Sequence, residues 1–231
     1  MKKNPPLAIR TIQQNLTEAL GELEDLWALI QIAVFGRLLP KEPEPRKEYA
    51  DRLAERLPLT DCDLFYSLDH AYHHLNFAWN CRRATEERAR ACATADFVRW
   101  SRFPKVAPFL DLQPLPRSAK GPPREVGIAL VRPSDILHAH VQMAVRHLSI
   151  LRDMATVAAG KSSALRYKPE APPPELFTEE TFGRHLHRIY RDMDTLWSCR
   201  RRTDVSVTRR THLRRARFPW VFVVAAARRL G

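Results

Sequence analysis

The chain has 231 residues, and its 38 lysines and arginines outnumber its 26 aspartates and glutamates, which gives a formal charge of +12. Because 45% of the residues are hydrophobic, we expect a folded protein with a substantial core rather than a disordered chain. The longest apolar stretches, Trp27 to Leu39 and Val221 to Ala227, are too short to span a bilayer. The composition therefore excludes a disordered tail and an integral membrane protein.

The use of glycine and proline indicates a helical architecture. The chain has only seven glycines, whereas its eighteen prolines cluster in residues 40–45, 104–133 and 169–174. This combination is typical of long helices separated by stiff connections. We predict an all-α fold with four main helices, near residues 7–36, 60–93, 134–160 and 178–204.

The first two of these helices carry clear local signals. Ile12, Leu16 and Leu23 belong to an apolar stripe with three-four spacing, which predicts one buried helix face. At the start of the second helix, Thr60 is a favourable N-cap residue, and Asp63 stands at the reciprocal position of a capping box. We therefore expect the second helix to begin directly after Thr60.

The same pattern occurs a second time along the chain. Residues 137–158 repeat the apolar spacing of the first helix, and the sequence Y-x-x-[LM]-x-x-x-W-x-C-R-R begins at Tyr72 and again at Tyr190. This identity predicts an internal duplication and an antiparallel bundle of two similar helical hairpins with pseudo-two-fold symmetry. The alternative is that two amphipathic helices resemble each other by chance.

The duplication divides the chain into a first hairpin repeat at residues 1–106, a proline-rich connection at 107–132 and a second repeat with an arginine-rich C-terminal region at 133–231. Trp79 and Trp197 lie on the apolar stripes and should anchor the core. Arg82 and Arg200 follow one turn later, where each guanidinium can reach the polar tip of a Tyr or Trp side chain or a carboxylate of a neighbouring helix.

Positive charge is concentrated near the end of the sequence. From Arg184 to Gly231 there are thirteen arginines and three acidic residues, and a weaker basic segment surrounds Arg99. Because arginine grips phosphate bidentately and stacks on bases, this distribution predicts a polyanionic partner, namely nucleic acid. The predicted nucleic-acid-binding residues are Arg82, Arg83, Arg99, Arg102, Arg200, Arg201, Arg202, Arg209, Arg210, Arg214, Arg215 and Arg217.

The sequence leaves the choice between RNA and DNA open. It has no zinc-finger spacing, RNP motif, GxxG loop or basic zipper, so contacts to the phosphate backbone are the expected mode of binding. We expect a non-catalytic accessory subunit of a larger nucleoprotein assembly. Docking on an acidic protein and a general bias toward arginine are the alternatives.

Nine histidines offer an enzymatic alternative. His70 and His74 are one helical turn apart and could chelate a transition metal. Two HxH pairs could bind zinc if all four imidazoles converged: His138 with His140, and His185 with His187. An Arg132–His138 pair of ribonuclease type has the required spacing, but Pro133 interrupts it. No further motif supports these sites, so we expect no metal and no cofactor.

Four cysteines, Cys62, Cys81, Cys92 and Cys199, form no CxxC pair. The initial lysines lead into prolines rather than into an apolar signal segment. We therefore expect reduced thiols and a cytoplasmic location. The apolar segment from Val221 to Ala227 would also suit an anionic membrane surface, although we expect it to pack on the bundle or on another protein.

Overall fold

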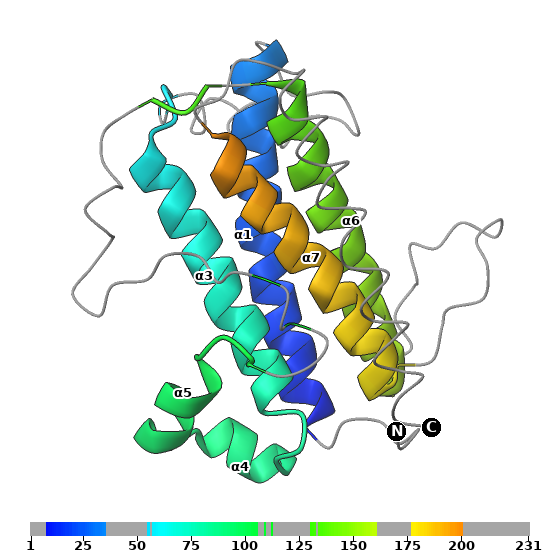
Figure 1. The fold of residues 1–231 in the computed structure, drawn as a ribbon. Coiled ribbons are helices and arrows are strands. Elements are labelled where there is room, and N and C mark those ends of the chain that lie inside the picture. Colours follow the sequence, from blue (N-terminus) through cyan, green and yellow to red (C-terminus); the bar gives the residue numbers. More distant parts are fainter. Residues whose placement is uncertain are drawn as a thin grey trace, which may run out of the picture.

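The computed structural model describes residues 8–35, 55, 57–105, 109, 112, 130–132, 134–160 and 177–200. These residues form α1 (Ile9–Phe35), α3 (Asp61–Asn80), α4 (Glu86–Ala91), α5 (Thr94–Trp100), α6 (Asp135–Ala158) and α7 (Glu179–Cys199) (Figure 1). Within the described residues the only strand-like pairing is an isolated antiparallel bridge between Thr60 and Leu130. The predicted all-α fold is confirmed for this part of the chain.

Four long helices form an antiparallel bundle (Figure 1). Helix α1 packs against α3 and α6, α6 packs against α7, and α3 also contacts α7. The short helices α4 and α5 lie at the end of the bundle where α1 begins and α3 ends (Figure 1). Buried residues from both hairpins belong to one continuous core, so the two predicted repeats share their interior.

The apolar stripes of α1 and α6 form much of this core. Leu16 and Leu23 on α1, and Val141 and Leu148 on α6, are completely buried. Their three-four spacing places them on one helix face, as the sequence predicted. Each such side chain contributes roughly 2 kcal/mol through the removal of apolar surface from water.

The starts of α3 and α7 use the same capping arrangement. The Thr60 side chain accepts a hydrogen bond from the Asp63 backbone N–H, and the Asp63 carboxylate accepts one from the backbone of Thr60. Thr178 and Thr181 form the equivalent box at the start of α7. Phe177 stacks on Phe182 with ring centroids 5.2 Å apart, as a hydrophobic staple requires. Both predicted helix starts are confirmed.

The predicted helix 60–93 is wrong at its C-terminal end, because α3 ends at Asn80. The Thr85 side chain accepts a hydrogen bond from the Arg88 N–H and begins α4, and Cys92 ends α4 in the left-handed region with a φ of 39°. The residues of the expected single helix therefore form two helices, α3 and α4, and α5 begins beyond its predicted end. The predicted end of the last helix at residue 204 lies outside the described residues.

Aromatic side chains fill the centre between α3 and α7. Tyr72 and Tyr190 face each other with ring centroids 4.8 Å apart, and Phe103 packs against both rings. The Tyr190 hydroxyl donates to Asn76 Oδ1 at 2.6 Å. Trp79 and Trp197 are also buried, which confirms them as core anchors.

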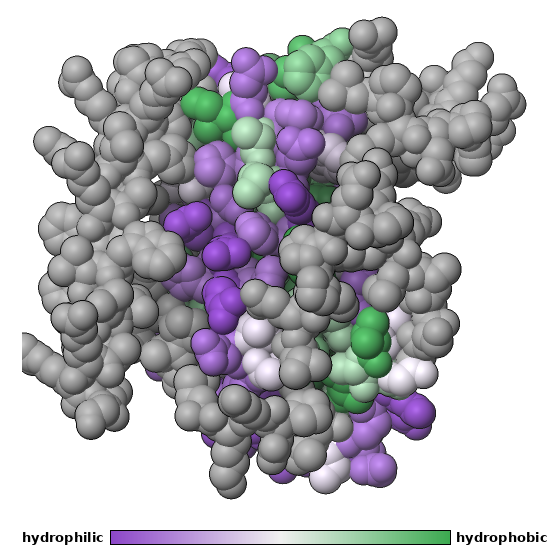
Figure 2. All heavy atoms as spheres, turned by 90° about the vertical axis from the view of Figure 1, so that its right-hand side faces the viewer, coloured by the Kyte–Doolittle hydropathy of each residue, from purple (hydrophilic) through white to green (hydrophobic). Residues whose placement is uncertain are grey.

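Most of the described surface visible in Figure 2 is hydrophilic, and its most apolar residues lie near the upper edge and toward the lower right of that view. Met143 and Val157 of α6 are among the large apolar side chains that remain exposed. Single exposed apolar residues of this kind are normal for a folded domain. None of the described helices is both long and apolar enough to cross a membrane.

Candidate nucleic-acid interface

The segment from Cys81 to Lys105 carries seven basic residues and three acidic ones. It comprises the turn after α3, the helices α4 and α5, and the residues that follow α5. Two asparagines of α3 fasten this segment to the bundle. Asn76 Nδ2 donates to the Ser101 carbonyl at 3.0 Å, and Asn80 Nδ2 donates to the carbonyls of Trp100 and Arg102 at 3.0 and 2.7 Å.

Four of the seven cations have a carboxylate partner. Arg82 and Arg83 share Glu179, with distances of 2.8 and 2.9 Å to Oε1. The Arg88 guanidinium binds Asp96 through two hydrogen bonds of 2.9 and 2.7 Å, and this contact lowers the pKa of the Asp96 carboxyl. Arg90 approaches Glu86 at 4.0 Å. These pairs neutralise much of the segment.

The other three cations, Arg99, Arg102 and Lys105, are exposed and have no ion-pair partner among the described residues. All three line a single hollow of about 350 Å³ at the end of α3. The other described residues that line it are Trp79, Asn80, Arg82, Phe103 and Pro104, so no carboxylate of the described residues lines it. The structure thus brings together Arg82, Arg99 and Arg102 from the predicted binding residues.

Arg82 occupies a fixed position within this hollow. Its Nε donates to Glu179, its Nη1 donates to the Trp79 carbonyl at 2.8 Å, and its guanidinium lies 3.9 Å from the centroid of the Trp79 ring. Burial would raise the pKa of Glu179, but hydrogen bonds and positive charge from Arg82 and Arg83 hold that pKa below its ordinary value. Glu179 therefore stays ionised and keeps Arg82 in place.

Arg200 makes the equivalent contacts at the opposite end of the bundle. Its guanidinium lies 3.7 Å from the centroid of the Trp197 ring, its Nη1 donates to the Trp197 carbonyl at 2.7 Å, and its Nε is 3.2 Å from Asp61. Only 13% of the Arg200 side chain is exposed, and the Asp61 side chain is completely buried. The prediction that both arginines reach a carboxylate of a neighbouring helix is confirmed.

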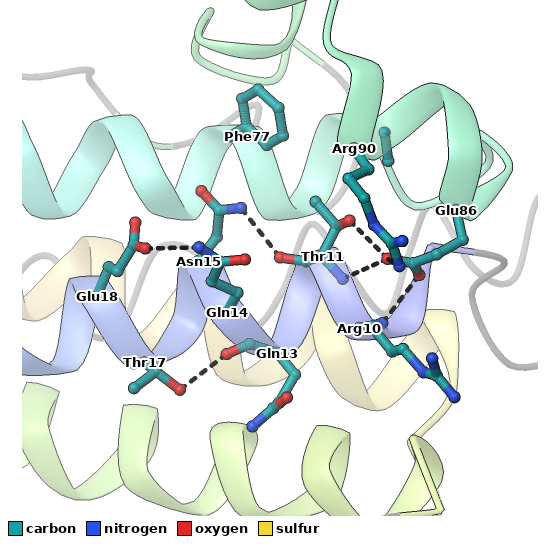
Figure 3. A pocket seen from close by; sticks show the side chains of 11 residues that line it. Arg10, Thr11, Gln13, Gln14, Asn15, Thr17, Glu18, Phe77, Glu86 and Arg90 are labelled. Carbon is teal, nitrogen blue, oxygen red and sulfur yellow. Dashed lines mark hydrogen bonds and ion pairs between the residues drawn. The ribbon is translucent and has the colours of Figure 1, made fainter.

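A second hollow, of about 560 Å³, lies beside the first half of α1 (Figure 3). Its charged lining is balanced, since Arg10 and Arg90 accompany Glu18 and Glu86. Glu86 is already engaged, because its carboxylate accepts hydrogen bonds from the backbone N–H groups of Arg10 and Thr11 at 3.1 and 3.0 Å. This hollow has no excess of either charge with which to select an ionic ligand.

The histidines of α3 contact polar residues of α1. His74 Nδ1 lies 3.1 Å from both Asn15 Oδ1 and Glu18 Oε2, and His70 Nδ1 lies 3.6 Å from Glu22. Burial lowers the pKa of His74. Within the described part of the chain, no group of three or more potential ligands could hold a metal ion.

The two HxH pairs do not converge. His138 accepts a hydrogen bond from the Trp27 indole at 3.0 Å, and His140 Nδ1 is 2.9 Å from Asp192. His185 instead packs against His147, with ring centroids 5.6 Å apart. The alternative of one zinc site made by four imidazoles therefore finds no support among the described residues, since His138 and His140 contact different helices and no group of three ligands forms.

The remaining predicted binding residues lie outside the described residues. They are Arg201, Arg202, Arg209, Arg210, Arg214, Arg215 and Arg217. Sequence reasoning did not identify Asn76 and Asn80, which position the basic segment. Two amides one turn apart near a helix end are the signal that could have indicated this role.

Comparison of the chain with protein-family models, curated proteins and solved structures finds no significant match.

Proposed function

We propose that the protein binds nucleic acid through its phosphate backbone, with little base specificity, as a non-catalytic subunit of a larger assembly. The observation that carries this proposal is the hollow at the end of α3, where Arg99, Arg102 and Lys105 gather and no described carboxylate belongs to the lining. Arginine presents a planar fork that matches phosphate oxygens, and lysine adds a mobile point charge. The cluster therefore suits an anionic polymer.

Neighbouring residues support this interpretation. Unneutralised like charges repel one another, and an anionic ligand relieves that repulsion. Elsewhere in the same segment, Arg83 and Arg88 have carboxylate partners. Among the described residues of the segment, the cations without such a partner are therefore those at the hollow. Arg200 supports the bundle rather than this surface, since it is mostly buried against Trp197 and Asp61.

The arginine-rich sequence after Arg200 favours nucleic acid over an acidic protein surface. The seven predicted arginines from Arg201 to Arg217 would extend the contact along a polymer of uniform negative charge. If about six phosphates are neutralised in total, log K should fall with log salt at a slope of roughly −4 on single strands or −5 on duplex DNA.

Fluorescence anisotropy against single- and double-stranded RNA and DNA of equal length tests the proposal. The double variant Arg99→Gln/Arg102→Gln removes two cations from the hollow, and we expect its salt slope to flatten by about 1.4 on single strands or about 1.8 on duplex DNA. The matched control is Arg146→Gln/Arg191→Gln, which removes two exposed arginines from α6 and α7.

The control should retain the wild-type slope. Equal losses in the two double variants would show that net charge, rather than the hollow, determines binding. If the wild-type protein binds none of the four polymers at low ionic strength, the proposal is wrong for the isolated chain. A stable complex with an acidic protein after nuclease treatment would then favour the docking alternative.

We also propose that the bundle arose by internal duplication. Support comes from matching contacts at equivalent sequence positions: Thr60 and Thr178 cap their helices, and Arg82 and Arg200 stack on Trp79 and Trp197. Superposition in an experimental structure tests this idea. If α1 and α3 together fail to superpose on α6 and α7 by a single rotation, the resemblance is local and the duplication is refuted.

A further inference from the structure

The hollow at the end of α3 has the volume of a small-ligand site. Its volume of about 350 Å³ is near the lower limit of small-ligand sites, which span about 300 to 1,000 Å³. Successive phosphates of a strand cannot all enter a hollow of this size. A single phosphate that enters it meets several cations at once.

The lining favours a doubly charged anion. An internal phosphodiester carries one negative charge, whereas a phosphomonoester carries about −1.5 to −2 near neutral pH. Arg99, Arg102 and Lys105 supply three positive charges, and none of the described lining residues is a carboxylate that competes for them. The second charge of a terminal phosphate therefore adds attraction that an internal phosphate cannot obtain here.

Arg82 adds a pre-positioned hydrogen-bond donor. Glu179 and the Trp79 carbonyl engage its Nε and Nη1, while Nη2 donates to no group among the described residues. Because the guanidinium is already fixed on the Trp79 ring, contact with a ligand requires little further ordering of this side chain. Asn80 holds the Arg102 backbone in place and so fixes a second part of the lining.

Trp79 forms a buried wall of the hollow. Its side chain is 2% exposed and lines the hollow, yet its indole N–H has no acceptor among the described residues.

We propose that this hollow binds the terminal phosphate of a nucleic-acid strand, with Arg82 as the fixed donor and Arg99, Arg102 and Lys105 as the mobile cations. This proposal rests on the proposed function and adds recognition of strand ends to it. Internal phosphates then contact only the outer surface of the segment. Strands with and without a terminal phosphate should therefore differ in affinity even when their sequence and length are identical.

The experiment compares three oligonucleotides of one sequence, which carry a 5′-phosphate, a 3′-phosphate or hydroxyl groups at both ends. We expect at least one phosphorylated end to bind about tenfold more tightly than the hydroxyl form. Arg99→Gln/Arg102→Gln should abolish that difference, whereas Arg146→Gln/Arg191→Gln should preserve it. Asn80→Ala should reduce the difference without changing the charge of the protein.

The possible results distinguish recognition of strand ends from binding of the phosphate backbone in general. Equal, salt-dependent binding of all three oligonucleotides that remains sensitive to Arg99→Gln/Arg102→Gln would refute end recognition and support backbone binding. Failure to bind any of them would refute both. Competition by a free mononucleotide as effective as the phosphorylated oligonucleotide would overturn the nucleic-acid assignment in favour of a small phosphate-bearing ligand.

Discussion

The two arginine–tryptophan contacts at opposite ends of the bundle should differ in energetic importance. We expect Arg200→Met to lower the free energy of unfolding by about 3 to 5 kcal/mol, since the change leaves a buried carboxylate without its arginine. The Asp61 side chain is completely buried. Arg82→Met should cost only about 1 to 2 kcal/mol. Glu179 is 23% exposed and retains Arg83 at 2.9 Å.

Methionine keeps an apolar side chain on each tryptophan ring, so the comparison isolates the loss of charge. Urea-induced unfolding followed by circular dichroism measures both changes. Arg146→Met, at an exposed position on α6, provides the control and should change stability by less than about 0.5 kcal/mol. Adding Asp61→Asn to Arg200→Met should recover part of the loss, because the uncompensated charge is then removed.

Equal losses in the free energy of unfolding for Arg200→Met and Arg82→Met would refute this reasoning. Burial of the carboxylate that remains would then have no influence on stability. A double variant Asp61→Asn/Arg200→Met that is no more stable than Arg200→Met alone would show that packing, rather than charge, dominates at this end of the bundle.

Two further predictions concern ionisable groups. Burial raises the pKa of the Cys81 thiol to about 12, so iodoacetamide at about pH 8 should modify the partly exposed Cys62 in the native protein and Cys81 only after unfolding, as measured by peptide mass spectrometry. Burial, together with the nearby positive charge of Arg188, lowers the pKa of His147 below 6.5 in the folded state. The unfolded state therefore binds the proton more readily, and the free energy of unfolding should decrease as the pH falls from about 7.5 to about 5.5. Urea midpoints at the two pH values should differ less in His147→Gln than in the wild-type protein, and an unchanged difference would contradict the assigned role of His147.

Local sequence signals predicted the long helices well, because each signal lies within the element that it specifies. The apolar spacing of α1 and the capping box at Thr60 depend only on residues a few positions apart. The end of α3 has a local and a distant contribution, since Thr85 caps the following helix α4 and Asn80 contacts a later segment. Asn80 binds the carbonyls of Trp100 and Arg102, which lie 20 and 22 residues further along the chain.

The candidate site could be predicted only in part for the same reason. The sequence identified Arg82, Arg99 and Arg102 as basic residues of one segment, but it could not distinguish paired cations from unpaired ones. That distinction depends on Glu179, which lies more than ninety residues from Arg82 and meets it only through helix packing. The partners of His138 and His140 could not be predicted, because Trp27 and Asp192 likewise lie on other helices.

The contact between Glu86 and the beginning of α1 has a consequence for synthesis of the chain. The first-turn N–H groups of Arg10 and Thr11 bind a carboxylate that is 76 and 75 residues away in sequence. During synthesis, α1 therefore leaves the ribosomal exit tunnel long before Glu86 can cap it. Until then the N–H groups of Arg10 and Thr11 donate to water. Only after α4 has left the exit tunnel can the N-terminal turn of α1 obtain its final hydrogen bonds.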